Sequence, residues 1–150
     1  MKIALGCDHG ALELKNALLP HLQAKGYEPV DFGTFTSASC DYPEFAAAAA
    51  KAVACGSCEK GIVLCTTGIG VSICANKIDG IRCALLSDTK SAEMTRLHND
   101  TNMMAIGAGV VRPELALKIV ETWIGTEFSG EERHQRRIDK LMALEADNVR

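Results

Sequence analysis

The segment GIVLCTTGIG, residues 61–70, joins an apolar run to a glycine-rich turn, with Cys65 at the junction. Glycines at positions 68 and 70 allow a tight turn in which successive backbone N–H groups point into one concavity that binds an anion. A thiol at the start of a helix loses its proton more readily than a free cysteine. Together these features predict proton abstraction next to a carbonyl, with the N–H groups holding the enediolate oxygen. The alternatives are a core cysteine that ends a strand and a turn that only needs glycine for its backbone.

Other side chains with catalytic potential stand where predicted elements end. Asp8 and His9 follow the first apolar run, and His98 and Asn99 end a predicted helix. Ligands of open α/β sheets bind outside the carboxyl ends of the strands. We therefore expect these four residues to meet the Cys65 turn at one edge of the sheet. A solvated or capping histidine is the alternative for His9 and for His98.

Two arginines one helical turn apart, Arg133 and Arg137, lie in the last predicted helix. Like charges at this spacing repel each other on an isolated helix, so a nearby anion would stabilise the arrangement. Arginine also matches the geometry of phosphate oxygens. The pair therefore predicts a phosphate clamp, with a solvated basic face as the alternative.

Apolar periodicity predicts that strands and helices alternate along the whole chain. Pro29 favours an edge position for the second strand, because proline cannot donate to an interior ladder. The alternation predicts one domain over residues 1–150, a three-layer α/β/α fold with a five-stranded parallel, Rossmann-like sheet. The expected strands cover 2–7, 27–32, 61–65, 82–86 and 103–106, and the expected helices cover 11–25, 44–54, 72–77, 91–97, 113–123 and 131–146.

The composition excludes several classes of protein. A net charge of -3 over 150 residues gives no basic excess for nucleic acid, and the apolar runs are too short for a signal peptide or a membrane span. Seven cysteines, an odd number without a signal segment, indicate reduced thiols and a cytoplasmic location. Cys55 and Cys58 form a C-x-x-C pair, but a structural zinc site needs four ligands. We therefore expect no metal and read this pair as a turn with two incidental thiols.

The motifs together resemble the type B ribose-5-phosphate isomerases, a family that also holds allose-6-phosphate and galactose-6-phosphate isomerases. The similarity runs from Lys2 to about Leu144. It is carried by GCDHG (6–10), DFGT (31–34), DYP (41–43), GIVLCTTGIGVSICANK (61–77), GIR (80–82), RLHNDTN (96–102), GxGVV (107–111) and RHQRR (133–137).

The resemblance implies an aldose–ketose isomerase of phosphorylated sugars that uses no cofactor. It also implies a homodimer, or a tetramer, in which each site borrows residues from the neighbour, with the helix at 131–146 at the dimer interface. The thiol matching Cys65 would shuttle the proton between C1 and C2, the histidine matching His98 would assist ring opening, and Thr67 would be a third catalytic residue. Substrate contacts are implied for Asp8, His9, Tyr42, Thr66, Gly68, Ile69, Gly70, Asn99, Arg133 and Arg137.

Two positions depart from the family pattern. The family commonly has CGTG where this chain has CTTG (65–68), and it often has a phosphate-binding arginine where Gly109 stands. Arg112, one helical turn further on, could take over that contact. Both departures bear on the choice of sugar more than on the reaction. We expect ribose 5-phosphate as substrate, with allose or galactose 6-phosphate as alternatives within the family and a non-catalytic nucleotide-binding module as the alternative outside it.

Overall fold

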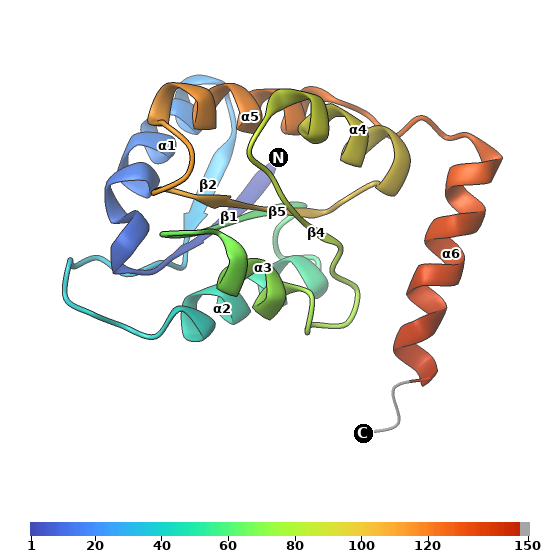
Figure 1. Cartoon of the computed structure of the whole chain (residues 1–150), viewed down its shortest axis with the longest axis horizontal. Coiled ribbons are helices and arrows are strands. Elements are labelled where there is room, and N and C mark those ends of the chain that lie inside the picture. The colour runs from blue at the N-terminus through green and yellow to red at the C-terminus, as the bar shows by residue number, and fades with distance from the viewer. Residues whose placement is uncertain (148–150) are drawn as a thin grey trace.

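The computed structural model describes residues 1–147, in which a five-stranded sheet lies between two layers of helices (Figure 1). The strands are β1 (Lys2–Cys7), β2 (Glu28–Asp31), β3 (Lys60–Cys65), β4 (Cys83–Leu85) and β5 (Met103–Gly107). The helices are α1 (Leu12–Ala24), α2 (Tyr42–Ala54), α3 (Ile69–Ala75), α4 (Thr89–Asn99), α5 (Pro113–Gly125) and α6 (Glu132–Asp147), with a short 3-10 turn over His9–Ala11.

All strand pairs are parallel, and the strand order is β2-β1-β3-β5-β4. The predicted fold class is therefore confirmed, and β2, which contains Pro29, lies at the edge of the sheet as its proline indicates. The order changes direction between β1 and β3, so the chain leaves the carboxyl ends of these two neighbouring strands toward opposite sides. Ligand sites of such folds form at this crevice.

Each face of the sheet packs against its own set of helices. On one face Ile62 and Leu64 of β3 pack with side chains of α1, α4 and α5, among them the fully buried Trp123. On the other face Val63 and Cys65 pack against α2 and α3. This alternation follows from the two-residue period of a strand, and it places the Cys65 side chain on the α2 and α3 side.

Three helices begin earlier than the periodicity predicts, namely α2, α3 and α4, of which α4 begins at Thr89 and not at residue 91. The segment expected to be a loop up to Pro43 ends at Asp41, because α2 begins at Tyr42 and tolerates Pro43 in its first turn. The helix expected from residue 72 begins at Ile69, directly after Gly68, whose φ is +75°. The turn after β3 is therefore shorter than expected, and Gly70 lies inside the helix.

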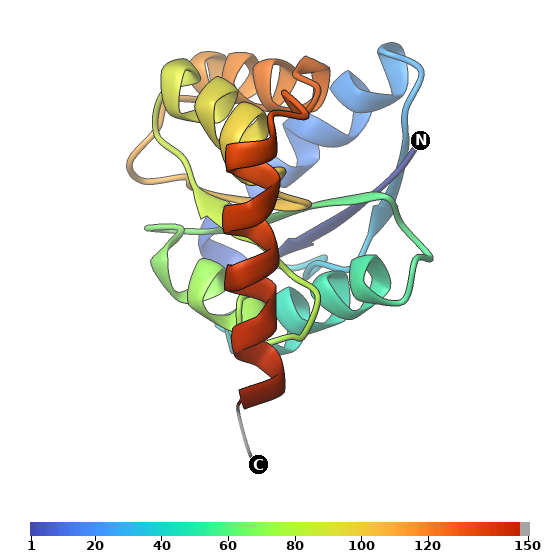
Figure 2. The same ribbon diagram turned by 90° about the vertical axis from the view of Figure 1, so that its right-hand side faces the viewer.

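Helix α6 stands apart from the two layers and crosses one end of the sheet (Figure 2). Among its residues up to 146, His134 and Ile138 are buried, one helical turn apart, and most of the others are exposed. Near its far end, Glu145 accepts a hydrogen bond from the backbone N–H of Gly80 at 2.9 Å. No helix within residues 1–147 is long and apolar enough to cross a membrane.

Candidate active site

Cys65 is the last residue of β3, and its thiol is buried at the mouth of the glycine-rich turn. The backbone N–H of Gly68 donates to Cys65 Sγ at 3.1 Å, and a donor in this position stabilises negative charge on sulfur. The next N–H, of Ile69, donates to Thr67 Oγ1 at 3.3 Å. Of the backbone donors that the sequence predicts in this turn, one is therefore directed at the thiol itself.

The two glycines of the turn are required for different reasons. Gly68 has a φ of +75°, and a Cβ there would lie 2.8 Å from the backbone N of Gly107 on β5. Gly70 lies under the ring of Tyr42, where a Cβ would come within 2.7 Å of the ring. The first glycine keeps the turn against the neighbouring strand, and the second lets Tyr42 cover the start of α3.

Asp8 and His9 follow β1 and lie at the same edge of the sheet as Cys65. Asp8 is buried and accepts a hydrogen bond from the N–H of Gly10 at 2.9 Å. The ring of His9 is exposed, and its Nδ1 accepts the backbone N–H of Cys40 at 3.2 Å. A neutral His9 in this arrangement carries its proton on Nε2, which makes Nε2–H a donor for an anionic ligand.

The two departures from the family pattern touch each other. The Gly109 N–H donates to the Thr66 carbonyl oxygen at 2.8 Å, and a Cβ at position 109 would lie 3.1 Å from that same oxygen. A Cβ at position 10 would collide with the hydroxyl oxygen of Thr66. Thr66 therefore occupies space that two glycines leave open. Arg112 is the exposed N-cap residue of α5, and its role in binding phosphate stays a prediction.

A second group of functional side chains lies between α4 and α6. A cavity of about 240 Å³ separates the end of α4 from α6. Arg82 is held there by the Asn99 carbonyl oxygen at 3.0 Å and the Asp100 carbonyl oxygen at 2.6 Å. The residues that line the cavity are Arg82, His98, Asn99, His134, Arg137, Ile138 and Leu141.

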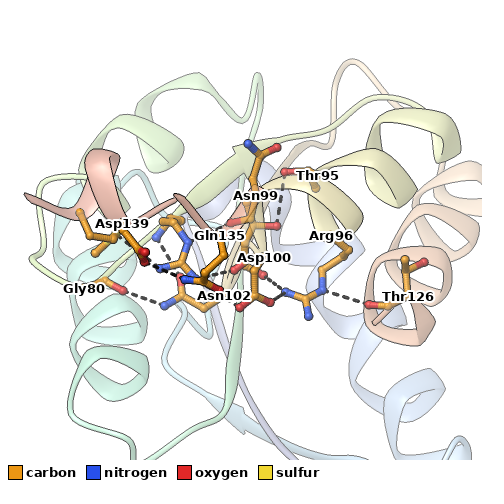
Figure 3. Close-up of polar contacts among 12 residues, drawn as sticks. Gly80, Thr95, Arg96, Asn99, Asp100, Asn102, Thr126, Gln135 and Asp139 are labelled. Atoms are coloured by element: carbon orange, nitrogen blue, oxygen red, sulfur yellow. Dashed lines mark hydrogen bonds and ion pairs between the residues drawn. The ribbon is translucent and has the colours of Figure 1, made fainter. Parts of the chain in front are cut away.

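Polar contacts fix the end of α4 beside this cavity, as Figure 3 shows. Arg96 forms an ion pair with Asp100 at 2.7 Å and donates to the carbonyl oxygen of Thr126 at 3.1 Å. Asn102 donates to the carbonyl oxygen of Gly80 at 2.7 Å. These contacts hold the backbone on which His98 and Asn99 are carried.

The expectation that His98 and Asn99 share an edge with Cys65 is wrong. Cys65 is paired with Gly107 at the carboxyl end of β5, whereas α4 returns the chain to the amino end of that strand at Met103. A helix that connects two parallel strands must run back along the sheet. The Cys65 turn and the pair His98 and Asn99 therefore lie at opposite ends of the strands, about 13 Å apart along β5 at 3.3 Å per residue.

The two arginines of the predicted phosphate clamp differ in their surroundings. Arg133 forms an ion pair with Glu131 at 2.7 Å, with both side chains more than half exposed. Arg137 lines the cavity, and among residues 1–147 it forms no ion pair with a carboxylate. Arg137 is therefore the one of the two that is open to an anion within a single chain.

His134 also belongs to this group, although it was not among the predicted site residues. Its ring stacks on that of His98, with 4.3 Å between centroids and 14° between planes. Burial, followed by the neighbouring charges of His98 and Arg133, lowers the pKa of His134 below its ordinary value. The signal was present in the spacing of positions 134, 138 and 141, which form the stripe of α6 that faces the cavity. Arg82, in the GIR motif, was also missed.

The C-x-x-C pair does not form a joint site. The Cys55 thiol is exposed and lies 3.0 Å from the hydroxyl of Ser57, whereas Cys58 is buried under α2. Within residues 1–147 no three His, Cys, Asp or Glu side chains are placed to hold one metal ion. Of the other cysteines, Cys7 is buried, whereas Cys74 and Cys83 are partly exposed.

Comparisons with known proteins agree over nearly the whole chain. A family model described as Ribose/Galactose Isomerase matches residues 3–141. Ribose-5-phosphate isomerase B of Escherichia coli (strain K12) is 46% identical over 144 residues, which are 96% of this chain and 96% of that protein. The structure of Clostridium thermocellum ribose-5-phosphate isomerase B has a TM-score of 0.96 at 47% identity and covers 98% of this chain and 99% of that chain. The crystal structure of Mycoplasma genitalium ribose-5-phosphate isomerase B with bound ribulose-5-phosphate has a TM-score of 0.93 at 36% identity. It covers 98% of this chain and 97% of that chain.

Proposed function

This chain belongs to the ribose/galactose isomerase family, and we propose the mechanism by which it interconverts ribose 5-phosphate and ribulose 5-phosphate. The reaction moves a carbonyl between C1 and C2 of the open-chain sugar. A base removes the proton from C2 of the aldose, an enediolate forms, the hydroxyl proton passes from O2 to O1, and the carbon-bound proton is returned to C1 as the ketose forms. Each of these steps is a proton transfer, so the protein must supply a base, hydrogen-bond donors for the enediolate and side chains that bind the phosphate.

Cys65 is the proposed base. The observation that carries this assignment is the N–H of Gly68, directed at Cys65 Sγ at 3.1 Å, because a hydrogen bond to the thiolate stabilises it relative to the thiol. The exposed hydroxyl of Thr67 and the backbone of Ile69 and Gly70 lie around the same turn. These groups are the proposed donors for the enediolate oxygen.

Substrate contacts at this edge are assigned to the residues that surround the turn. Asp8, His9 and Tyr42 are expected to bind the sugar hydroxyls and phosphate, and Nε2–H of His9 is suited to an anion. The Thr66 backbone and the Gly68 turn would lie beneath the sugar.

The second half of the site comes, in our proposal, from another copy of the chain. His98, Asn99, Arg133 and Arg137 lie at the far edge of the sheet, so they cannot close over Cys65 of their own chain. A pair of chains brings the two groups together when each contributes one half. Apolar side chains for such an interface are exposed on α3 and on α6, namely Ile69 (52%), Ile73 (56%), Leu141 (49%) and Leu144 (61%).

His98 is the proposed acid–base group for opening the furanose ring, and the arginines are the proposed phosphate ligands. Ribulose 5-phosphate cannot form a furanose ring, because its 5-hydroxyl is esterified. His98→Asn should therefore lower kcat with ribose 5-phosphate more than kcat with ribulose 5-phosphate. Equal losses in the two directions would contradict a role in ring opening.

The test of the base compares two cysteines of the same region. Cys65→Ala should lower kcat by at least about 10²-fold, the lower end of general-base contributions, with the fold retained by circular dichroism. Cys74→Ala, on α3 and partly exposed, is the control and should keep the wild-type kcat. Turnover near the wild-type rate in Cys65→Ala would overturn the mechanism.

The test of the shared site uses the inactive Cys65→Ala variant and an Arg137→Ala variant with weakened substrate binding. Arg137→Ala should raise KM by about tenfold or more, because a bidentate phosphate contact exists in both ground and transition states. A heterodimer of Cys65→Ala and Arg137→Ala protomers has one site with Cys65 from one chain and Arg137 from the other. Mixing should therefore raise activity at low substrate above that of both parents. If native mass spectrometry shows heterodimers and activity does not rise, the arginine works within its own chain.

The choice of sugar has its own measurement. Ketose formation followed by NMR with ribose 5-phosphate, allose 6-phosphate and galactose 6-phosphate should give the highest kcat/KM for the pentose. Faster conversion of a hexose phosphate would move this chain to another branch of the family without affecting the assignment of Cys65.

A further inference from the structure

The stacked histidines between α4 and α6 carry an inference about how His98 is held. His134 is 5% exposed, although α6 is otherwise mostly exposed. Its ring lies 4.3 Å from the His98 ring and nearly parallel to it, at 14°. His98 itself is partly exposed and lines the cavity of about 240 Å³. Stacking of this kind restricts how the His98 ring can rotate.

The environment of His134 favours the neutral ring. Its Nε2 is buried and has no hydrogen-bond partner within residues 1–147. An imidazolium would carry an N–H at this atom, and a buried N–H of a cation without an acceptor is strongly disfavoured. The direction of the pKa shift of His134, below its ordinary value, agrees with this geometry.

The charged groups around the two histidines also favour a neutral His134. The groups that face His134 are His98 from α4, Arg133 and Arg137 from its own helix, and Glu131 just before that helix. Arg82 lines the same cavity from the segment before β4. Arg82 forms an ion pair with Asp100 at 3.5 Å, which leaves Arg133 and Arg137 against one glutamate to oppose a further positive charge on His134.

We propose that His134 is a positioning residue for His98: a neutral ring whose stacking sets the orientation of the His98 imidazole. This rests on the ring-opening role proposed for His98. A ring that is free to rotate would present its nitrogen to the sugar ring oxygen for only part of the time. Misplacement of a catalytic group by about 1 Å can cost about 10²-fold in rate.

Two substitutions separate the stacked ring from the nitrogen atoms. His134→Phe keeps an aromatic ring that cannot be charged, and His134→Ala removes the ring. In His134→Ala we expect kcat with ribose 5-phosphate to fall by about tenfold or more, and kcat with ribulose 5-phosphate by less than about threefold. In His134→Phe both values should stay within about threefold of wild type. If His134→Phe loses as much activity as His134→Ala, a ring nitrogen acts directly and the proposal is wrong.

NMR of the histidine ring protons tests the positioning without any activity. The His98 Hε1 resonance should show an upfield ring-current shift in the wild type and in His134→Phe, and should lose it in His134→Ala. Titration of wild-type His134 should give a midpoint below about 6.5. Unchanged His98 shifts in a folded His134→Ala variant would overturn the proposal. Equal loss in both directions in His98→Asn would instead count against the ring-opening role, and the NMR result would still stand.

Discussion

Substitution of Gly68 by alanine should damage both the stability of the chain and its chemistry. Gly68 has a φ of +75°, and a Cβ added at this position would lie 2.8 Å from the backbone N of Gly107. The left-handed conformation costs an L-residue about 1–2 kcal/mol, and overpacking against a neighbouring backbone costs about 1–3 kcal/mol. We expect a loss of about 3 kcal/mol, which corresponds to about 6–12 °C in Tm for a chain of this size.

The same substitution moves the N–H that Gly68 directs at Cys65 Sγ. A hydrogen bond to a charged acceptor contributes about 1.5–3 kcal/mol, so its loss should lower kcat by about ten- to 10²-fold. Gly26→Ala is the matched control, because Gly26 has a φ of +83° with nothing within 4 Å of an added Cβ. That variant has only the left-handed cost, so it should lose about 2–8 °C and keep the wild-type kcat. Equal Tm losses in the two variants, with kcat retained in both, would refute the reasoning.

Three further predictions concern ionisable side chains. Lys15→Met removes a buried ammonium bound to a carboxylate at 2.7 Å and should lower the free energy of unfolding by about 3 kcal/mol in urea, whereas the exposed Lys25→Met should cost less than about 1 kcal/mol. Burial raises the pKa of Cys7 to about 11, whereas the Ser57 hydroxyl lowers the pKa of Cys55. Iodoacetamide should therefore alkylate Cys55 at least about tenfold faster than Cys7, as followed by peptide mass mapping. Burial lowers the pKa of Lys60 to about 8, so between about pH 8 and pH 10.4 the unfolded chain holds a proton that the folded chain lacks. As the pH rises through this window, the free energy of unfolding of the wild type should therefore increase relative to that of Lys60→Met.

The sequence predicted the layers of this fold well because they depend on local patterns. Apolar periodicity separates strands from helices over short segments, and the restricted hydrogen bonding of Pro29 is enough to place β2 at an edge. The order of the inner strands was not predicted, because β5 is inserted between β3 and β4 and no local pattern encodes that neighbour.

The site was predicted less completely because its contacts join distant segments. Gly70 was expected to serve the turn, yet it gives room to Tyr42, 28 positions earlier. His98 was assigned to the wrong end of the strands, because the end of a helix in the sequence does not by itself show in which direction the helix runs along the sheet. The spacing of His134, Ile138 and Leu141 marks one stripe of a charged helix, but the stacking of His134 on His98 depends on α4, which is distant in the sequence.

The attachment of α6 has a consequence for how this protein loses activity. Local opening of a segment requires less free energy when few of its apolar groups are buried, and within a single chain α6 buries chiefly His134 and Ile138. Once the proposed dimer dissociates, the backbone amides of α6 should therefore exchange with deuterium well before those of β3, whose residues from Gly61 to Cys65 are all buried. Detachment of α6 would carry away Arg137 and uncover the His98 ring while the Cys65 turn stays folded. In the proposed dimer, a helix that opens in one copy would inactivate the site of the other, so mild denaturant should abolish turnover before the sheet unfolds.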